Sequence, residues 1–115
     1  MMGRKLTIAI VALLLAGCAG HGAGDPALYQ GLAESDVEMA SRLTQTTLES
    51  APDGATRRWA NQQTGNGGGI TPLRTYVSER GYFCRDYREE LTVAGHAGRF
   101  YHTACRDDAA RWAWL

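Results

Sequence analysis

Hydrophobic and polar positions divide the chain into three parts with different patterns. Residues 6–15 form an apolar run that carries no charge and directly follows Arg4 and Lys5. Residues 35–50 repeat apolar positions at helical spacing, whereas from residue 55 onward aromatic and β-branched residues are separated by Gly- and Asp-containing turns. This change of period predicts one amphipathic helix followed by a series of strands.

The expected helix begins at Ser35 or Asp36 and ends before the turn at residues 51–54. Glu38 stands three residues after Ser35, which is the spacing of a capping box. An interfacial membrane helix would need several basic residues on its polar face, and here only Arg42 is basic. We therefore expect this helix to pack on a sheet, through a face made of Met39, Ala40, Leu43, Thr47 and Leu48.

The rest of the chain is expected to form antiparallel hairpins. Strands are predicted at residues 55–61, 70–79, 82–93, 99–106 and 111–115, with a glycine loop at 64–69 and turns at 80–81, 94–98 and 107–108. The predicted fold class is therefore α+β: an N-terminal helix packed on a small antiparallel β-sheet or partly open barrel, stapled by one disulfide.

The N-terminal apolar run is typical of an export signal. It is shorter than the roughly 20 residues that a membrane span needs, and Leu15-Ala16-Gly17-Cys18 follows it at once. Small residues directly before a cysteine form the lipobox of bacterial lipoproteins, which predicts removal of residues 1–17 and lipidation of Cys18. The Gly- and Ala-rich residues 18–34 are then a lipidated flexible tether, and residues 35–115 are the domain.

Export would place the two remaining cysteines, Cys84 and Cys105, in an oxidising compartment. In an oxidising compartment such a pair favours a disulfide over a metal site, and its spacing is not that of a CxxC motif. The two cysteines lie on neighbouring predicted strands. Counted from a turn centred near His96, however, they are three positions out of register, so direct pairing requires a bulge or a differently placed turn.

The charge balance argues against nucleic acid as a partner. The chain has 12 basic and 12 acidic residues; removal of 17 of the 115 residues leaves 98 and takes away Arg4 and Lys5, so 10 basic residues face 12 acidic ones at a formal net charge of −2. Nucleic-acid binding would need a clustered basic face. The glycine loop lacks the Gly-Lys-Ser/Thr end of a phosphate loop, and no cofactor or metal site is predicted.

Several short motifs in order make residues 48–115 resemble a known family. They are Trp59, Asn61, Thr64-Gly65-Asn66-Gly67, Thr71-Pro72, Arg74-Thr75-Tyr76, Cys84-Arg85-Asp86-Tyr87, Ala104-Cys105-Arg106 and Trp112. This order behind a lipobox resembles the C-terminal domain of the 17 kDa rickettsial-type outer-membrane surface antigens. The family's Asn-Pro before Thr-Gly is replaced here by Asn61-Gln62-Gln63. The glycine-zipper segment of many relatives is also replaced, by the short tether, so we expect anchoring by lipid alone.

The resemblance implies an outer-membrane lipoprotein with a structural or interaction role in the cell envelope and no catalysis. Its expected partners are the membrane, through the lipid, and an envelope protein or peptidoglycan. The alternative is a periplasmic inhibitor or ligand-binding module, such as a lysozyme-inhibitor-like lipoprotein. Such inhibitors are also small, lipidated, disulfide-stapled β domains.

Three side chains are candidates for contact with a ligand: Arg85, Arg106 and Trp114. Each arginine follows a cysteine, so both are expected on the sheet face opposite the disulfide, where they could line an anion-binding groove. The alternative is pairing with carboxylates across the strands, the candidates being Asp86, Glu89, Glu90 and Asp107. Trp114, near the chain end, is expected to be exposed, and Trp59 and Trp112 are expected in the core.

A catalytic site is not expected. His102 lies on a predicted strand, with Asp86 and Asp107 as candidate orienting acids. Ser78 is the only serine of the strand region and lies near a turn, whereas a hydrolase needs nucleophile, base and acid in contact.

Overall fold

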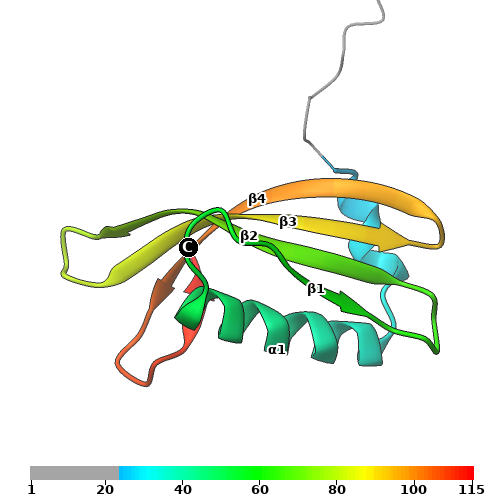
Figure 1. Cartoon of the computed structure of the whole chain (residues 1–115), viewed down its shortest axis with the longest axis horizontal. Coiled ribbons are helices and arrows are strands. Elements are labelled where there is room, and N and C mark those ends of the chain that lie inside the picture. Colours follow the sequence, from blue (N-terminus) through cyan, green and yellow to red (C-terminus); the bar gives the residue numbers. More distant parts are fainter. Residues whose placement is uncertain (1–23) are drawn as a thin grey trace, which may run out of the picture.

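The computed structural model describes residues 24–115, so the predicted leader at 1–17 and Cys18 lie outside the described residues. One long helix lies across one face of an open, five-stranded antiparallel sheet with strand order β1-β2-β3-β4-β5 (Figure 1). The elements are η1 (Pro26–Gly31), α1 (Glu34–Ser50), β1 (Arg57–Ala60), β2 (Gly67–Val77), β3 (Phe83–Val93), β4 (His96–Arg106) and β5 (Trp112–Trp114). The α+β prediction is confirmed, and the sheet is open rather than closed into a barrel.

The folded domain includes residues before residue 35. Residues 26–31, expected within the flexible tether, form the 3₁₀ helix η1, whose start is capped by the Asp25 side chain accepting the Ala27 N–H. Leu28, Tyr29 and Leu32 pack against the buried cluster that contains Leu91 and Val93. Because these three side chains bury apolar surface on the sheet, this stretch is a folded element and not a linker.

Helix α1 begins one to two residues before the predicted start. Ala33 is the N-cap residue, and its N–H donates to Asp36 Oδ2 at 2.8 Å. The predicted capping box from Ser35 to Glu38 is therefore wrong, because Asp36 at the third helical position caps the helix instead. Ala40, Thr47 and Leu48 are buried as expected, whereas Met39 is 37% exposed.

The turn between β3 and β4 explains how the cysteines meet. Ala94 and Gly95 both have positive φ, 50° and 80°, which is the two-residue hairpin turn that matches strand twist. The hairpin is thus centred between these two residues and not near His96. Cys84 lies directly opposite Cys105 and the two form the predicted disulfide without a bulge in this strand pair.

Half of the predicted glycine loop belongs to a strand. Gly67, Gly68 and Gly69 pair with β1 on one side and β3 on the other. A Cβ on Gly68 would lie 2.4 Å from the Glu90 carbonyl oxygen and 2.7 Å from Trp59 Nε1. The glycine is therefore required by the packing of Trp59, which is 7% exposed, on the backbone of β2.

Two apolar clusters hold the helix against the sheet. Leu43 of α1 packs on both. One consists of Leu48, Ile70, Tyr87, Ala104 and Trp112, and the other of Ala40, Trp59, Leu91 and Val93. Trp59 and Trp112 are thus core residues, as predicted.

A buried carboxylate fixes the start of α1 to the sheet. Asp36 is 0% exposed. Besides the Ala33 N–H, it accepts hydrogen bonds from Asn61 Nδ2 (2.8 Å), Thr64 Oγ1 (2.7 Å) and Asn66 Nδ2 (2.8 Å). Asn66 also accepts the Ala94 N–H of the β3–β4 turn at 3.0 Å. The Thr64-Gly65-Asn66 motif therefore connects the helix to both hairpins.

The hydrogen bonds from these donors keep the Asp36 carboxyl group ionised at neutral pH. Burial alone raises the pKa of this carboxyl, but the hydrogen bonds from Thr64, Asn66, the Ala33 N–H and Asn61 outweigh burial and lower the pKa to about 2. The ordinary value, 3.8, applies to the unfolded chain. A depressed pKa in the folded state stabilises the fold above pH 3.8, and this contribution is lost as the pH falls from there toward 2.

Replacement of Asp36 by Asn is expected to lower the free energy of unfolding by about 2–4 kcal/mol, because an amide turns one buried acceptor into a donor that faces other donors. Urea unfolding followed by circular dichroism at pH 7 measures this loss. Glu38→Gln, at an exposed position of the same helix, is the control and is expected to change stability by less than about 0.5 kcal/mol. The acid-dependent loss below pH 3.8 should also be smaller in Asp36→Asn. Equal stability of the two variants would contradict the assigned network.

Reduction of the Cys84–Cys105 disulfide is expected to lower the free energy of unfolding by about 3 kcal/mol, as the chain-entropy model gives for a loop of this length. Unfolding curves with and without a reductant measure the difference. The double variant Cys84→Ala/Cys105→Ala is the control, and reductant should leave its curve unchanged. A wild-type curve that does not respond to reductant would contradict the expectation.

Candidate functional site

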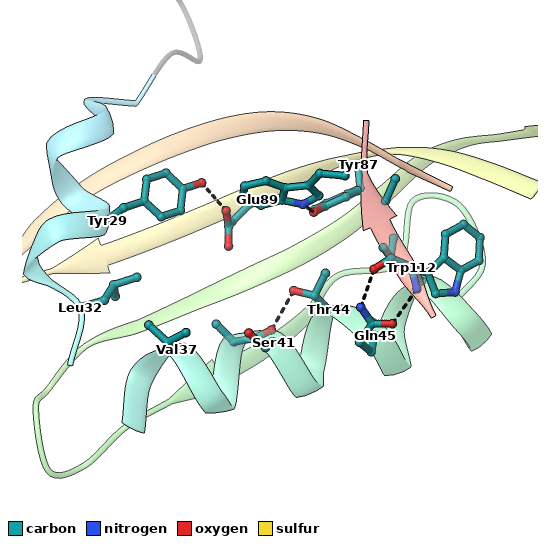
Figure 2. A pocket seen from close by; sticks show the side chains of 13 residues that line it. Tyr29, Leu32, Val37, Ser41, Thr44, Gln45, Tyr87, Glu89 and Trp112 are labelled. Carbon is teal, nitrogen blue, oxygen red and sulfur yellow. Dashed lines mark hydrogen bonds between the residues drawn. The ribbon is translucent and has the colours of Figure 1, made fainter. Parts of the chain in front are cut away.

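Helix α1 lies closer to one side of the sheet face than to the other. It packs mainly on β1 and β2 and reaches β5, whereas η1 packs on β3 (Figure 1). Between η1 and β5 the sheet face of β3 and β4 is left open toward the helix. A pocket of about 370 Å³ lies there, bordered by α1, η1, β3, β4 and β5 (Figure 2).

The floor of the pocket carries a buried carboxylate, Glu89 of β3. Strand alternation turns Tyr87 and Glu89 toward the helix, and Glu89 is only 6% exposed. The Tyr29 hydroxyl of η1 donates to Glu89 Oε1, and His102 Nε2 of β4 lies 2.9 Å from the same oxygen. Among the described residues no hydrogen bond reaches the other oxygen, Oε2, so this atom is left for a further partner.

Tyr29 is held as a hydrogen-bond donor to this carboxylate. Burial, followed by the hydrogen bond to Glu89 and its negative charge, raises the pKa of the Tyr29 hydroxyl well above its ordinary value. The hydroxyl is therefore protonated at neutral pH. Figure 2 shows it pointing from η1 toward Glu89 across the pocket.

Trp114 and Tyr87 form an aromatic wall. The Trp114 ring stacks on the His102 ring, with 4.4 Å between centroids and 12° between planes, and its Nε1 donates to the Tyr87 hydroxyl. Burial raises the pKa of Tyr87, the hydrogen bond from Trp114 opposes this, and the charge of Glu89 adds to the rise. Tyr87 therefore also stays neutral, and Trp114 is fixed in place although it is 62% exposed.

The helix wall includes three polar side chains. Ser41, Thr44 and Gln45 of α1 line the pocket opposite Glu89 (Figure 2). Gln45 accepts the Trp112 N–H at 2.9 Å and donates to the Trp112 carbonyl at 2.7 Å. This pair of bonds attaches the short strand β5 to the helix and thereby closes one end of the pocket.

The two candidate arginines lie outside this pocket. They line a separate cavity of about 280 Å³ at the C-terminal end of α1. Arg85 is 6% exposed and donates to the Leu48 carbonyl (2.7 Å) and to Asp53 Oδ1 (2.8 Å). Arg106 donates to Glu49 Oε2 at 3.0 Å. Both arginines are ion-paired, but with carboxylates of the helix end and the turn after it, and not with any of the four predicted carboxylates.

These ion pairs act on the carboxyl groups as well. The hydrogen bond from Arg85 is the largest cause that lowers the pKa of Asp53, and the hydrogen bond from Arg106 does the same for Glu49. Because Arg85 also binds a carbonyl at the end of α1, it stabilises the helix terminus. Of the three candidate ligand residues only Trp114 borders the pocket on the β3–β4 face.

The histidine cluster differs from the one considered in the sequence. His102 contacts Glu89 and not Asp86 or Asp107. Asp86 accepts from Arg74 and Thr103, and Asp107 accepts the N–H groups of Ala109 and Arg111 in its own turn. Ser78 accepts the Tyr82 N–H in the β2–β3 turn.

The alternation of Tyr87 and Glu89 along β3 was the sequence signal that could have placed Glu89 in a site. Nothing in the pattern of residues 26–31 indicated that Tyr29 would reach it.

The part of the chain from residue 24 to 115 offers no cluster of three His, Cys, Asp or Glu side chains suited to a metal ion. Over the same residues, neither helix has the length and apolarity required to cross a bilayer.

Fold and pocket together define a small, disulfide-stapled α+β domain with an amphipathic pocket between its helix and its sheet. A family model described as 17 kDa outer membrane surface antigen matches residues 46–113. The chain belongs to this family. The resemblance seen in the sequence motifs is confirmed.

Curated relatives agree with the family match. The chain is 37% identical over 82 residues to a 17 kDa surface antigen of Rickettsia bellii (strain RML369-C), which covers 71% of this chain and 52% of the relative. Identity to the 17 kDa surface antigen of Rickettsia conorii (strain ATCC VR-613 / Malish 7) is 35% over the same length and the same shares of both chains. This chain thus spans about half the length of the curated relatives it matches. No solved structure matches it.

Replacement of Arg85 by Met is expected to lower the melting temperature by about 10 °C, because it leaves the Leu48 carbonyl without its buried donor. Arg106→Met is the matched control. It removes a half-exposed ion pair and is expected to shift the melting temperature by less than about 4 °C. Thermal unfolding followed by circular dichroism compares the two. Equal shifts would contradict the structural role assigned to Arg85.

Proposed function

We propose that this protein is an outer-membrane lipoprotein whose domain is a non-catalytic binding module of the cell envelope. Cys18 carries the acyl chains, and the domain extends from residue 24 to the C-terminus. The observation that carries the proposal is the short distance in sequence between the lipobox cysteine and η1, the first element of the described residues. Only residues 19–25 separate Cys18 from η1, a stretch that spans at most about 25 Å.

Lipid attachment at Cys18 accounts for location. Stable anchoring takes two or more acyl chains, and mature bacterial lipoproteins normally carry three. Residue 19 is Ala and not Asp, which by analogy with lipoprotein sorting favours transfer to the outer membrane. The family description and the names of the rickettsial relatives support the same address.

An interaction role is supported by the pocket. A histidine with an orienting acid is present in His102 and Glu89. Among the described residues, however, His102 hydrogen-bonds only Tyr29 and Glu89 and no serine, although Ser41 lines the same pocket. The pocket combines apolar walls with a few placed polar groups, which is typical of ligand-binding sites. We propose an envelope protein or peptidoglycan as the partner that such a module would contact from its lipid anchor.

Replacement of Cys18 by Ala is expected to abolish acylation and leader cleavage, because the thiol is the acyl acceptor. Intact-mass analysis of the membrane-extracted protein should show an acylated chain starting at Cys18 in the wild type and an unacylated, uncleaved chain in the variant.

The double variant Cys84→Ala/Cys105→Ala is the control for cysteine loss in general, and it should retain the acyl mass. A wild-type protein with an unmodified Cys18, or with the leader still attached, would remove the basis of the proposed anchoring.

A further inference from the structure

We infer that the pocket between α1 and strands β3 and β4 binds an alkylammonium group, with the ammonium on Glu89 and its aliphatic stem between the helix and the aromatic wall. This ligand class rests on the binding role proposed above and makes it specific.

The carboxylate is placed as a cation acceptor. Glu89 is more than nine-tenths buried, and Tyr29 and His102 both bond its Oε1. Its Oε2 has no hydrogen-bond partner among the described residues, and Glu89 lines the pocket. This oxygen is not one of the fully buried unpartnered atoms of the described residues, so it is accessible from the pocket. An ammonium N–H that enters the pocket would donate a charge-assisted hydrogen bond to it.

The charges around the pocket select a cation over an anion. Of residues 24–115, Glu89 is the only charged one that lines it. The nearest candidate cations of the helix end, Arg85 and Arg106, line the other cavity and are each paired with a carboxylate. Tyr29 and His102 contact Glu89 only at Oε1, so an anionic ligand beside Oε2 would meet the carboxylate charge with no arginine of the described residues lining the pocket, which is unfavourable.

The walls fit an aliphatic stem. Leu32, Ala40, Leu48 and Ala104 supply apolar surface. The rings of Tyr29, Tyr87 and Trp114 also line the pocket, and ring faces attract cations. At about 370 Å³ the pocket is at the small end of ligand sites. It therefore suits one short chain with one ammonium, such as a lysine side chain, and not a polymer.

The test uses the exported full-length protein in zwitterionic lipid nanodiscs, with methyl NMR at pH 8, where an ordinary imidazole is neutral and an amine is charged. The probes are n-pentylammonium, pentanoate and 1-pentanol, which share one stem length. Pentylammonium is expected to shift the methyl signals of Ala40, Leu48 and Ala104 saturably. Pentanol should bind about tenfold more weakly, and pentanoate should give no shift.

Glu89→Gln is expected to weaken pentylammonium binding about tenfold or more, since the amide retains the shape and removes the charge. Asp86→Asn is the matched control: Asp86 is the β3 carboxylate on the opposite face of the sheet, bonded to Arg74 and Thr103. Its effect should be less than about twofold. Equal binding to both variants overturns the inference, as does equal binding of pentanoate and pentylammonium to the wild type. The second comparison uses only the wild-type protein, so it still tests the inference if Glu89→Gln does not fold.

Two further arms identify the source of the ammonium. Nα-acetyl-lysine methylamide represents a lysine of a polypeptide partner, and cadaverine represents a free amine. Preference for either supports the alkylammonium site and names its source, whereas no shift with either overturns it. The Cys18→Ala variant in the same assay separates the two proposals, because a loss of anchoring at Cys18 leaves Glu89 and its pocket unchanged.

Discussion

The rest of the structure depends on the buried carboxylate of Asp36. Its hydrogen bonds join the first turn of α1 to the loop between β1 and β2, and through Asn66 to the turn between β3 and β4. A small domain has a thin apolar core, so directional polar contacts carry a large share of its specificity. Because Asp36 fixes where α1 crosses the sheet, it also determines which side of the sheet face the helix leaves open.

The pocket is a direct result of this placement. With α1 over β1 and β2, the inner face of β3 and β4 would be uncovered, and the chain covers its two ends with η1 and β5. Tyr29 anchors the first of these to Glu89, and Gln45 attaches the second through both polar groups of Trp112. Gln45 thus has a structural role through its bonds to the Trp112 backbone, Thr44 bonds the Ala40 carbonyl of its own helix, and both still line the cavity. This arrangement explains why Ser41, Thr44 and Gln45 occupy helix positions that a fully packed core would fill with apolar side chains.

The family match includes the side-chain donors of the Asp36 hydrogen-bond network but not Asp36 itself. The matched residues 46–113 contain the donors Asn61, Thr64 and Asn66, whereas the acceptor Asp36 precedes them. The sequence predicts a glycine-rich loop at residues 64–69. In the structure, Thr64 and Asn66 of this segment donate hydrogen bonds to the buried Asp36 carboxylate. Gly65, at φ 76°, supplies the turn that directs Thr64 and Asn66 to the same carboxylate. The arginines after the two cysteines also connect the sheet to α1. Arg85 donates to the Leu48 carbonyl and Arg106 donates to the Glu49 carboxylate, both near the C-terminal end of the helix.

The amino-acid sequence by itself determined the long helix and the five strands apart from their ends, the α+β class, the disulfide and the burial of Trp59 and Trp112. Each follows from local periodicity, turn residues or cysteine count, which are visible within short stretches of chain. Tertiary structure alone decided that residues 26–31 fold, that Arg85 pairs with Asp53, and that Tyr29, Glu89 and His102 meet. These contacts join residues far apart in the chain, and they depend on where α1 and η1 dock on the sheet. Docking is set by packing and buried hydrogen bonds over the whole domain, and no local pattern encodes it.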